Sequence, residues 1–252
     1  MRHALITAGT KGLGRMVTKQ LLEDGYSVTA TYRSDRHAAE QLAKELSDYE
    51  EHLHIVQADM TNKEDLYRLV VETKSEYQRI DALILNAGPY IFERKKLIDY
   101  TDTEWSEMIT GNLSSTFYLL KEVLPMMREQ RYGRIVTYGF QGADDAPGWK
   151  FRSAFAAAKT GLVSLTKTVS IEEAENGITA NMVCPGIIAG EMKEATIIEG
   201  KRQKDEHTPI GRSGTGEDIA RTVAFLCDEN SDMITGAVIE VTGGVDVINR
   251  YR

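Results

Sequence analysis

The stretch TAGTKGLG, residues 7–14, decides the fold because of what stands on either side of it. Residues 3–8 form an apolar run typical of a buried strand, and residues 12–24 have the spacing of an amphipathic helix. Glycines let the chain turn tightly and let backbone N–H groups at a helix N-terminus approach a pyrophosphate. A turn that only packs would show similar glycines, but the strand before it and the helix after it favour a dinucleotide-binding turn.

Short apolar runs alternate with helical patterns along the chain. We expect strands at residues 3–8, 27–33, 53–59, 81–88, 134–139, 178–186 and 237–244. Helical patterns lie near residues 12–24, 36–47, 62–77, 102–129, 153–175 and 216–227. Because several strands are apolar almost throughout, they fit a parallel sheet that is covered on both faces. The sequence therefore predicts an α/β fold of Rossmann type, a doubly wound parallel seven-stranded sheet in a three-layer α/β/α arrangement, with ligands at the carboxyl ends of the strands.

The composition narrows the class of protein. The 252 residues contain no Pro/Gly/Ser-rich linker and no repeat, so we expect a single domain over residues 1–252. The formal net charge of −8 argues against nucleic acid as the main partner. Neither an apolar leader nor a run of about 18 apolar residues is present, so we expect a cytoplasmic protein without a membrane partner. Cys184 and Cys227 read as buried thiols, and the five histidines show no metal-ligand spacing, so we expect no metal site.

The end of the second predicted strand bears on the choice of dinucleotide. An acidic residue there would bind the adenosine ribose hydroxyls and repel a 2′-phosphate. This strand ends instead in Tyr32-Arg33, and Lys11 lies in the glycine turn. Two cations at this corner favour NADP(H) over NAD(H), although both could instead be ordinary solvated surface charges.

Further motifs follow the predicted strands in order. They are Asp59-Met60, the LNAG of residues 85–88, GNLSSTFYLL with Asn112, AFAAAKTGL with Lys159, NMVCPGII, and the closing RSGTGEDIARTVAFL and ITGAVIEVTGG. With the glycine turn, they make the chain resemble the short-chain dehydrogenase/reductase family from Ala4 to about Val247. The likeness is greatest to the 3-oxoacyl-[acyl-carrier-protein] reductases. It implies an NADP(H)-dependent oxidoreductase that reduces a carbonyl such as a 3-oxoacyl thioester.

The resemblance also implies a set of binding residues. Asp59 would bond the adenine, residues 86–88 would line the adenosine side, and the turn at residues 185–188 would meet the nicotinamide carboxamide. Lys159 would bind the nicotinamide ribose, and Asn112 would support a water that links this lysine to solvent, so these two form the expected catalytic set. A lysine on a helix face of small and apolar residues would otherwise extend to the surface. The full expected cofactor set is Gly9, Thr10, Lys11, Gly12, Leu13, Gly14, Arg33, Asp59, Met60, Asn86, Ala87, Gly88, Lys159, Pro185, Gly186 and Ile188.

The resemblance breaks where the family carries out its chemistry. A tyrosine four residues before the lysine supplies the proton in that family, and a serine at the end of the fifth strand is the second donor. Here Phe155 and Phe140 stand at those positions, and phenylalanine neither donates nor accepts a hydrogen bond. Losing a positioned acid costs roughly 10²–10⁴-fold in rate. Ala8 in place of the first glycine and Gly190 in place of a common threonine are further departures.

The sequence leaves the proton donor and the activity open. Tyr138 is a candidate because it lies two residues before Phe140 and would share its strand face, unless its ring only packs. Lys159 or a water held by Asn112 would be slower donors. The chain is either an active carbonyl reductase or a catalytically impaired NADP(H)-binding protein that acts as a sensor or assembly subunit. A reductase of activated double bonds ranks last, because Arg152 stands where that group has a tyrosine, seven residues before the lysine.

Three more expectations concern partners and motion. An acidic acyl carrier protein would need cations near the entrance, and Arg128, Arg131 and Arg134 offer some, but the acidic IEEAENGI of residues 171–178 weakens this partner. The resemblance implies a homotetramer built on the fourth and fifth helices and the last strand. The polar segment of residues 187–210 is expected to form a mobile substrate lid.

Overall fold

The computed structural model describes residues 1–248, and within them seven strands form one parallel sheet in the order β3-β2-β1-β4-β5-β6-β7. The order reverses between β1 and β4, which is the switch point of a doubly wound sheet. The predicted Rossmann-type sheet is therefore confirmed. The strands are β1 (His3–Ile6), β2 (Ser27–Tyr32), β3 (Leu53–Gln57), β4 (Ala82–Leu85), β5 (Gly133–Tyr138), β6 (Ile178–Pro185) and β7 (Val238–Val241).

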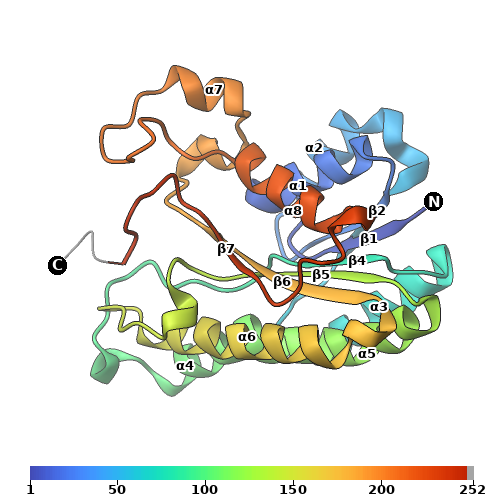
Figure 1. The fold of residues 1–252 in the computed structure, drawn as a ribbon, viewed down its shortest axis with the longest axis horizontal. Helices are drawn as coiled ribbons and strands as arrows, with labels where there is room; N and C mark the ends of the chain where they lie inside the picture. Colours follow the sequence, from blue (N-terminus) through green and yellow to red (C-terminus); the bar gives the residue numbers. More distant parts are fainter. Residues whose placement is uncertain (249–252) are drawn as a thin grey trace.

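Helices cover both faces of the sheet, which confirms the three predicted layers (Figure 1). One face carries α1 (Gly12–Glu23), α2 (Arg36–Glu45) and α8 (Gly216–Cys227). The opposite face carries α3 (Lys63–Tyr77), α4 (Asp102–Ile109), α5 (Ser115–Gln130) and α6 (Ser153–Glu172). The short α7 (Ile197–Arg202) stands apart from these layers, beyond the carboxyl ends of the strands (Figure 1).

The central strand β1 shows why the sequence reads as apolar throughout. Ala4 and Ile6 pack into the core on the side of α1 and α8, whereas Leu5 packs into the core on the side of α3 and α5. All three are fully buried. A strand covered on both faces needs apolar side chains in both directions, and each buried CH₂ group stabilises the fold by about 0.8 kcal/mol.

The predicted helix over residues 102–129 is interrupted in its middle. A π-helical turn at Thr110–Ser114 joins α4 to α5, and it contains Asn112. The Asn112 Nδ2 donates to the carbonyls of Met108 (3.0 Å) and Pro89 (2.9 Å), which fixes the amide. Such a turn inserts one extra residue into the helical hydrogen-bond ladder and often marks a functional site. Apolar spacing alone does not reveal this insertion, so the prediction of one regular helix is wrong at this point.

The segment predicted to be a lid is folded in the structure. Residues 187–210 contain a 3₁₀ turn, Gly190–Glu194, and then α7, which begins with a capping box formed by Thr196 and Glu199. The segment's mobility remains a prediction. Among residues 1–248, no helix combines the length and the apolar character that crossing a bilayer would require.

His3 gives the fold a testable dependence on pH. The ring is fully buried, stacks on Tyr77 with 3.8 Å between ring centroids, and bonds Ser27 Oγ and Thr29 Oγ1 at 2.9 and 3.0 Å. Burial lowers the pKa of His3 to about 3. Below pH 6.5, His3 binds a proton in the unfolded chain but stays neutral in the native state. The free energy of unfolding therefore falls as the pH decreases from 6.5 towards 3.

We therefore expect the neutral His3 to lower the free energy of unfolding by about 2–3 kcal/mol when the pH decreases from 6.5 to 4.5. Urea unfolding of the natural chain and of His3→Gln, at neutral pH and at pH 4.5, measures the difference. The variant should lose less stability on acidification than the natural chain by about that amount. Equal losses in the two proteins would mean that His3 is not held neutral.

Candidate active site

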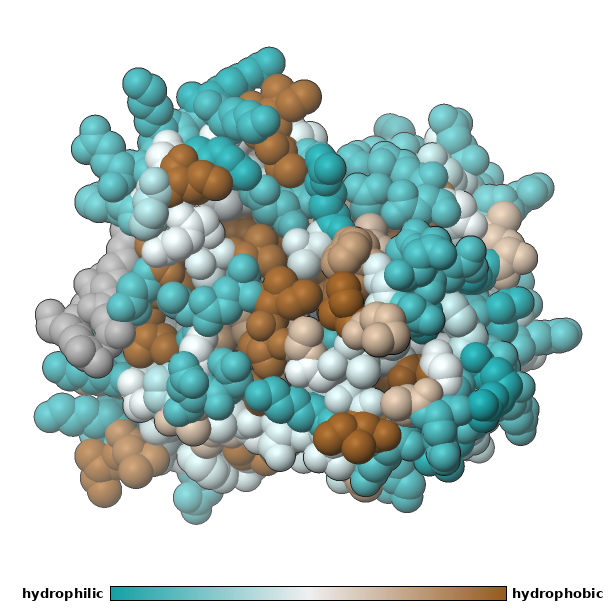
Figure 2. Space-filling view, viewed as in Figure 1, coloured by the Kyte–Doolittle hydropathy of each residue, from teal (hydrophilic) through white to brown (hydrophobic). Residues whose placement is uncertain are grey.

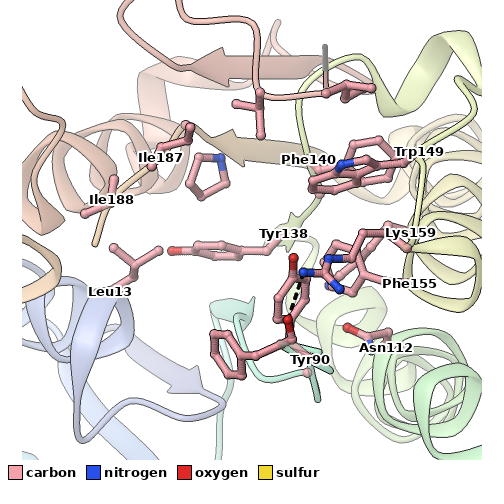
Figure 3. Close-up of a pocket in the computed structure, with 18 of the residues that line it drawn as sticks. Leu13, Tyr90, Asn112, Tyr138, Phe140, Trp149, Phe155, Lys159, Ile187 and Ile188 are labelled. Atoms are coloured by element: carbon pink, nitrogen blue, oxygen red, sulfur yellow. Dashed lines mark hydrogen bonds between the residues drawn. The ribbon is translucent and has the colours of Figure 1, made fainter. Parts of the chain in front are cut away.

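A cavity of about 750 Å³ opens at the carboxyl ends of the central strands. On the face shown in Figure 2, apolar side chains gather in the middle of the molecule and hydrophilic ones surround them. Figure 3 shows Leu13 and Ile188 on one side of the cavity and Lys159, Phe155 and Asn112 on the other. The expected site residues that line it are Leu13, Asn86, Gly88, Asn112, Lys159, Pro185, Gly186 and Ile188.

The other expected cofactor residues do not line this cavity but lie at the same edge of the sheet. Those of the glycine turn follow β1, and the others follow β2, β3 and β4. The side chains of Thr10 and Met60 are buried, so they can offer a ligand only their backbone. The residues of this outer set are Gly9, Thr10, Lys11, Gly12, Gly14, Arg33, Asp59, Met60 and Ala87.

The glycine turn is held against its neighbours by short contacts. Ala8 has a left-handed φ of 51°, and its N–H donates to Thr31 Oγ1 at 3.0 Å. The Asn86 Nδ2 donates to the carbonyls of Thr7 and Ala8 at 3.2 and 3.1 Å. A Cβ on Gly14 would lie 2.1 Å from the Ala8 oxygen, so glycine is required there. Asn86 thus braces the turn, a role in addition to the one expected for it.

The N-terminus of α1 already holds an anion from the chain itself. The Gly12 N–H donates to Glu194 Oε1 at 2.7 Å, and Arg15 bonds Glu194 Oε2 at 3.0 Å. Free N–H groups and the helix dipole make such a terminus an anion site, and the carboxylate is a stand-in for a phosphate oxygen. The backbone geometry of this turn therefore fits the pyrophosphate of a dinucleotide.

At the corner expected to hold a 2′-phosphate, one of the two expected cations is paired with a carboxylate. Lys11 Nζ bonds Asp35 Oδ2 at 3.0 Å, and the other oxygen of Asp35 accepts from Ala38 N–H at the start of α2. The hydrogen bond from Lys11 lowers the pKa of Asp35. Arg33 is exposed, and among residues 1–248 no carboxylate forms an ion pair with it. The sequence reasoning missed Asp35 because it lies past the strand, at the helix cap.

Lys159 is almost completely buried, and it lines the cavity. Its residue is 4% exposed, and no acceptor for the Nζ is found among the described residues. Burial lowers the pKa of Lys159 to about 8. The Nζ lies 5.7 Å from the centre of the Phe155 ring, one helical turn earlier in α6. The lysine therefore does not extend to the surface.

Asn112 and Lys159 meet at Gly88. A Cβ on Gly88 would lie 2.2 Å from Asn112 Oδ1 and 3.6 Å from Lys159 Nζ. The Asn112 Oδ1 is buried and has no hydrogen-bond partner within the described part of the chain. A buried acceptor and a buried ammonium thus border one small gap that only glycine leaves open. The two expected catalytic residues are brought together, while their catalytic roles remain predictions.

Comparison with known proteins agrees with this geometry. A family model described as Enoyl-(Acyl carrier protein) reductase matches residues 7–246. The chain belongs to the short-chain dehydrogenase/reductase family. It is 64% identical to YtkK of Bacillus subtilis, provisionally named an oxidoreductase, over all of this chain and 99% of that protein. It is 34% identical to the 3-oxoacyl-[acyl-carrier-protein] reductase FabG of Staphylococcus epidermidis, over 97% of this chain and 98% of that reductase.

A solved structure supports the same family. It comes from Bacillus thuringiensis and is provisionally described as a 3-oxoacyl-reductase. It superposes with a TM-score of 0.93 at 64% sequence identity, over 99% of this chain and all of that one. The family inferred from the motifs is therefore confirmed.

Aromatic rings line the part of the cavity around Phe140 and Phe155. Phe140 lies 4.9 Å from Trp149 and 6.2 Å from Phe155, measured between ring centroids. Tyr90 stands edge-on to Phe155 at 4.9 Å. Tyr90 was missed by the sequence reasoning, because a tyrosine in the loop after LNAG belongs to no expected motif.

Tyr138 does not share the side of Phe140, so that prediction is wrong. β5 ends at Tyr138, whose ring packs with the core next to α1 and α8, whereas Phe140 turns into the core next to α6. Figure 3 shows the Tyr138 hydroxyl pointing towards Leu13. That oxygen is buried without a hydrogen-bond partner in the described residues, and burial raises the pKa of Tyr138. Tyr138 is therefore a poor acid, although its ring lines the cavity.

The three arginines expected to meet a carrier protein lie near the amino end of β5, away from the cavity. Arg128 pairs with Glu173, and Arg131 bonds Asn176 Oδ1 at 3.0 Å. Arg134 is 2% exposed and donates to backbone carbonyls, including those of Gly133 and Gly177. The expectation is wrong for Arg134, because its guanidinium is used to satisfy buried carbonyl groups.

Proposed function

We propose that the chain is an NADP(H)-dependent oxidoreductase that reduces a carbonyl, such as that of a 3-oxoacyl thioester. One observation carries the proposal: a buried ammonium, Lys159, borders a cavity that adjoins an anion-binding glycine turn. Support comes also from the names of the relatives, which are reductases and an oxidoreductase. A group whose pKa lies near the working pH is suited to proton transfer, and Lys159 has a pKa of about 8.

Each part of the site has a role in this reaction. When bound, NADPH supplies a hydride to the carbonyl carbon of the substrate. Gly12 N–H and the α1 terminus would hold the pyrophosphate, and Leu13 with the turn at residues 185–188 would confine the nicotinamide. Glu194 must leave Gly12 for this, so we propose that residues 187–210 move as a lid when the dinucleotide binds.

Lys159 takes the role of proton donor in this proposal. The C–O π bond breaks as hydride adds to the carbon, and the oxygen takes a proton from the Lys159 ammonium. The neutral amine then recovers a proton from solvent by way of the gap next to Asn112 Oδ1. Phe155 contributes only an apolar wall, which keeps water from the ammonium and keeps its pKa low.

A second function is favoured by the two phenylalanines at the catalytic positions. With Phe155 and Phe140 there, the chain would bind NADP(H) with little or no turnover and act as a sensor or as an assembly subunit. The geometry of the glycine turn supports binding equally in both cases. Only a measurement of turnover separates the two.

Phe155→Tyr provides this measurement. It places a phenol one helical turn before Lys159, so we expect ketone or acetoacetyl-thioester reduction to increase by about 10²-fold or more. Phe151→Tyr is the matched control, because it adds the same hydroxyl to a ring that does not line the cavity. NADPH oxidation is followed by absorbance. A natural chain without turnover and an active variant would support the second function, while clear turnover by the natural chain would contradict it.

The dinucleotide preference is tested at the Arg33 corner. Arg33→Ala should weaken NADPH binding about tenfold and leave NADH binding unchanged, since a charged hydrogen bond to the 2′-phosphate is lost. Asp35→Asn should strengthen NADPH binding, because it releases Lys11 while an asparagine still caps α2. Arg36→Ala is the control, since Arg36 pairs with Glu40 on the outside of α2. Fluorescence titration gives the dissociation constants, and a parent that prefers NADH would refute the assignment.

We also propose that the chain forms a homotetramer. Trp105, Phe117 and Ile171 on α4, α5 and α6 are 41%, 47% and 79% exposed. Large apolar side chains exposed on neighbouring helices favour an interface there.

A further inference from the structure

The charged residues that line the cavity in the described part of the chain are all cationic. Among the described residues that line it, no Asp or Glu occurs, although the chain as a whole has a formal net charge of −8. A surface with the average composition of this chain would put acids there at least as often as bases. The cationic residues that line the cavity are Arg94, Lys150, Arg152, Lys159 and Lys193.

Arg152 is held in place by several contacts. Its Nη1 donates to the carbonyls of Glu93 (2.6 Å) and Phe151 (3.2 Å), and its Nη2 donates to that of Phe92 (3.0 Å). The guanidinium carbon lies 5.0 Å from the centre of the Tyr90 ring. Within residues 1–248, Arg152 has no carboxylate partner. Two of its five N–H groups, at Nε and Nη2, remain without a protein acceptor there.

A second cation stands close by. Lys150, two residues before Arg152, is exposed, and its Nζ lies 5.1 Å from the centre of the Phe151 ring. Neutral carbonyls and aromatic faces hold these side chains in place but do not cancel their charge. An anionic group would neutralise this charge, and the guanidinium group of arginine can bind both oxygens of a carboxylate.

Between these cations and Lys159 the walls are aromatic. Phe155 and Trp149 are 6.0 Å apart between centroids and both line the cavity together with Tyr90. Such walls accept a flat or apolar body and exclude water from it. The cavity thus has a proton-bearing end at Lys159, an apolar middle and a cationic end at Arg152.

We propose that the carbonyl substrate carries a carboxylate, and that Arg152, assisted by Lys150, binds it. The inference rests on the proposed function of the same cavity and gives its substrate class: an oxo compound with an aromatic or acyl body and an anionic end. Arg152 is then a specificity residue that holds the substrate with its carbonyl towards Lys159.

A pair of probes that differ in charge tests this. 4-Acetylbenzoate and its methyl ester have the same ketone and the same ring. Calorimetry on the full chain, with and without saturating NADP⁺, should show the carboxylate binding about tenfold tighter than the ester. Raising the sodium chloride concentration should weaken the carboxylate and leave the ester unchanged. Turnover of both probes with NADPH is measured in parallel.

Variants locate the effect. Arg152→Lys keeps the charge but loses the fork, and should weaken carboxylate binding about tenfold without changing ester binding. Lys150→Met removes an exposed side chain with no hydrogen bond to the described residues, so it tests the inference even if position 152 affects folding. It should weaken the carboxylate about threefold. Lys167→Met, an equal change of charge on the exposed face of α6, should leave both probes unchanged.

Equal affinity for the two probes would overturn the inference, and so would binding of neither. A carboxylate preference that survives in both Arg152→Lys and Lys150→Met would overturn it as well. Selective carboxylate binding without NADPH oxidation would support the inference while the proposed reductase function fails. Equal affinity for the two probes, together with turnover of both, would overturn the inference while supporting the reductase function.

Discussion

The site depends on one buried ammonium. Lys159 lies on a helix of small and apolar residues, with an aromatic ring one turn away and no hydrogen-bond acceptor among the described residues. Removing a charge from water without a partner is costly, so the lysine holds its proton weakly. The Asn112 Oδ1, which has no hydrogen-bond partner among the described residues, lies near this ammonium. Because Gly88 has no side chain, a small polar gap remains between the two groups.

The rest of the fold places that ammonium in the cavity at the carboxyl ends of the central strands, next to the glycine turn. The strand order reverses between β1 and β4, next to the glycine turn. Helix α6, which carries Lys159, packs on the opposite face of the sheet from α1. Glu194 shows that the turn binds anions even when the chain supplies them. In the proposed function a dinucleotide replaces this carboxylate, which would link its binding to the position of the segment between β6 and α8.

The alternation of strands and helices and many residues of the cavity could be predicted from the sequence. Apolar spacing and short motifs depend only on residues near one another in the chain. The predicted strands ran too far at their carboxyl ends, since motifs such as LNAG continue past Leu85 after the ladder has ended. The π turn around Asn112, the ion pair of Lys11 with Asp35 and the side on which Phe140 packs depend on contacts between distant segments. Arg134 looked exposed because arginine usually is, yet here it satisfies buried carbonyls. The one-signed charge of the cavity emerges only when separate loops are brought together.

The role proposed for Lys159 depends on the pKa of its ammonium group. Nuclear magnetic resonance titration of the lysine side-chain carbons, assigned by comparison with Lys159→Met, measures the pKa of this group in the folded chain. We expect a midpoint near 8, well below the usual value of 10.5. A midpoint at or above 10.5 would show that the ammonium is solvated or paired, and would contradict the proposed proton donor.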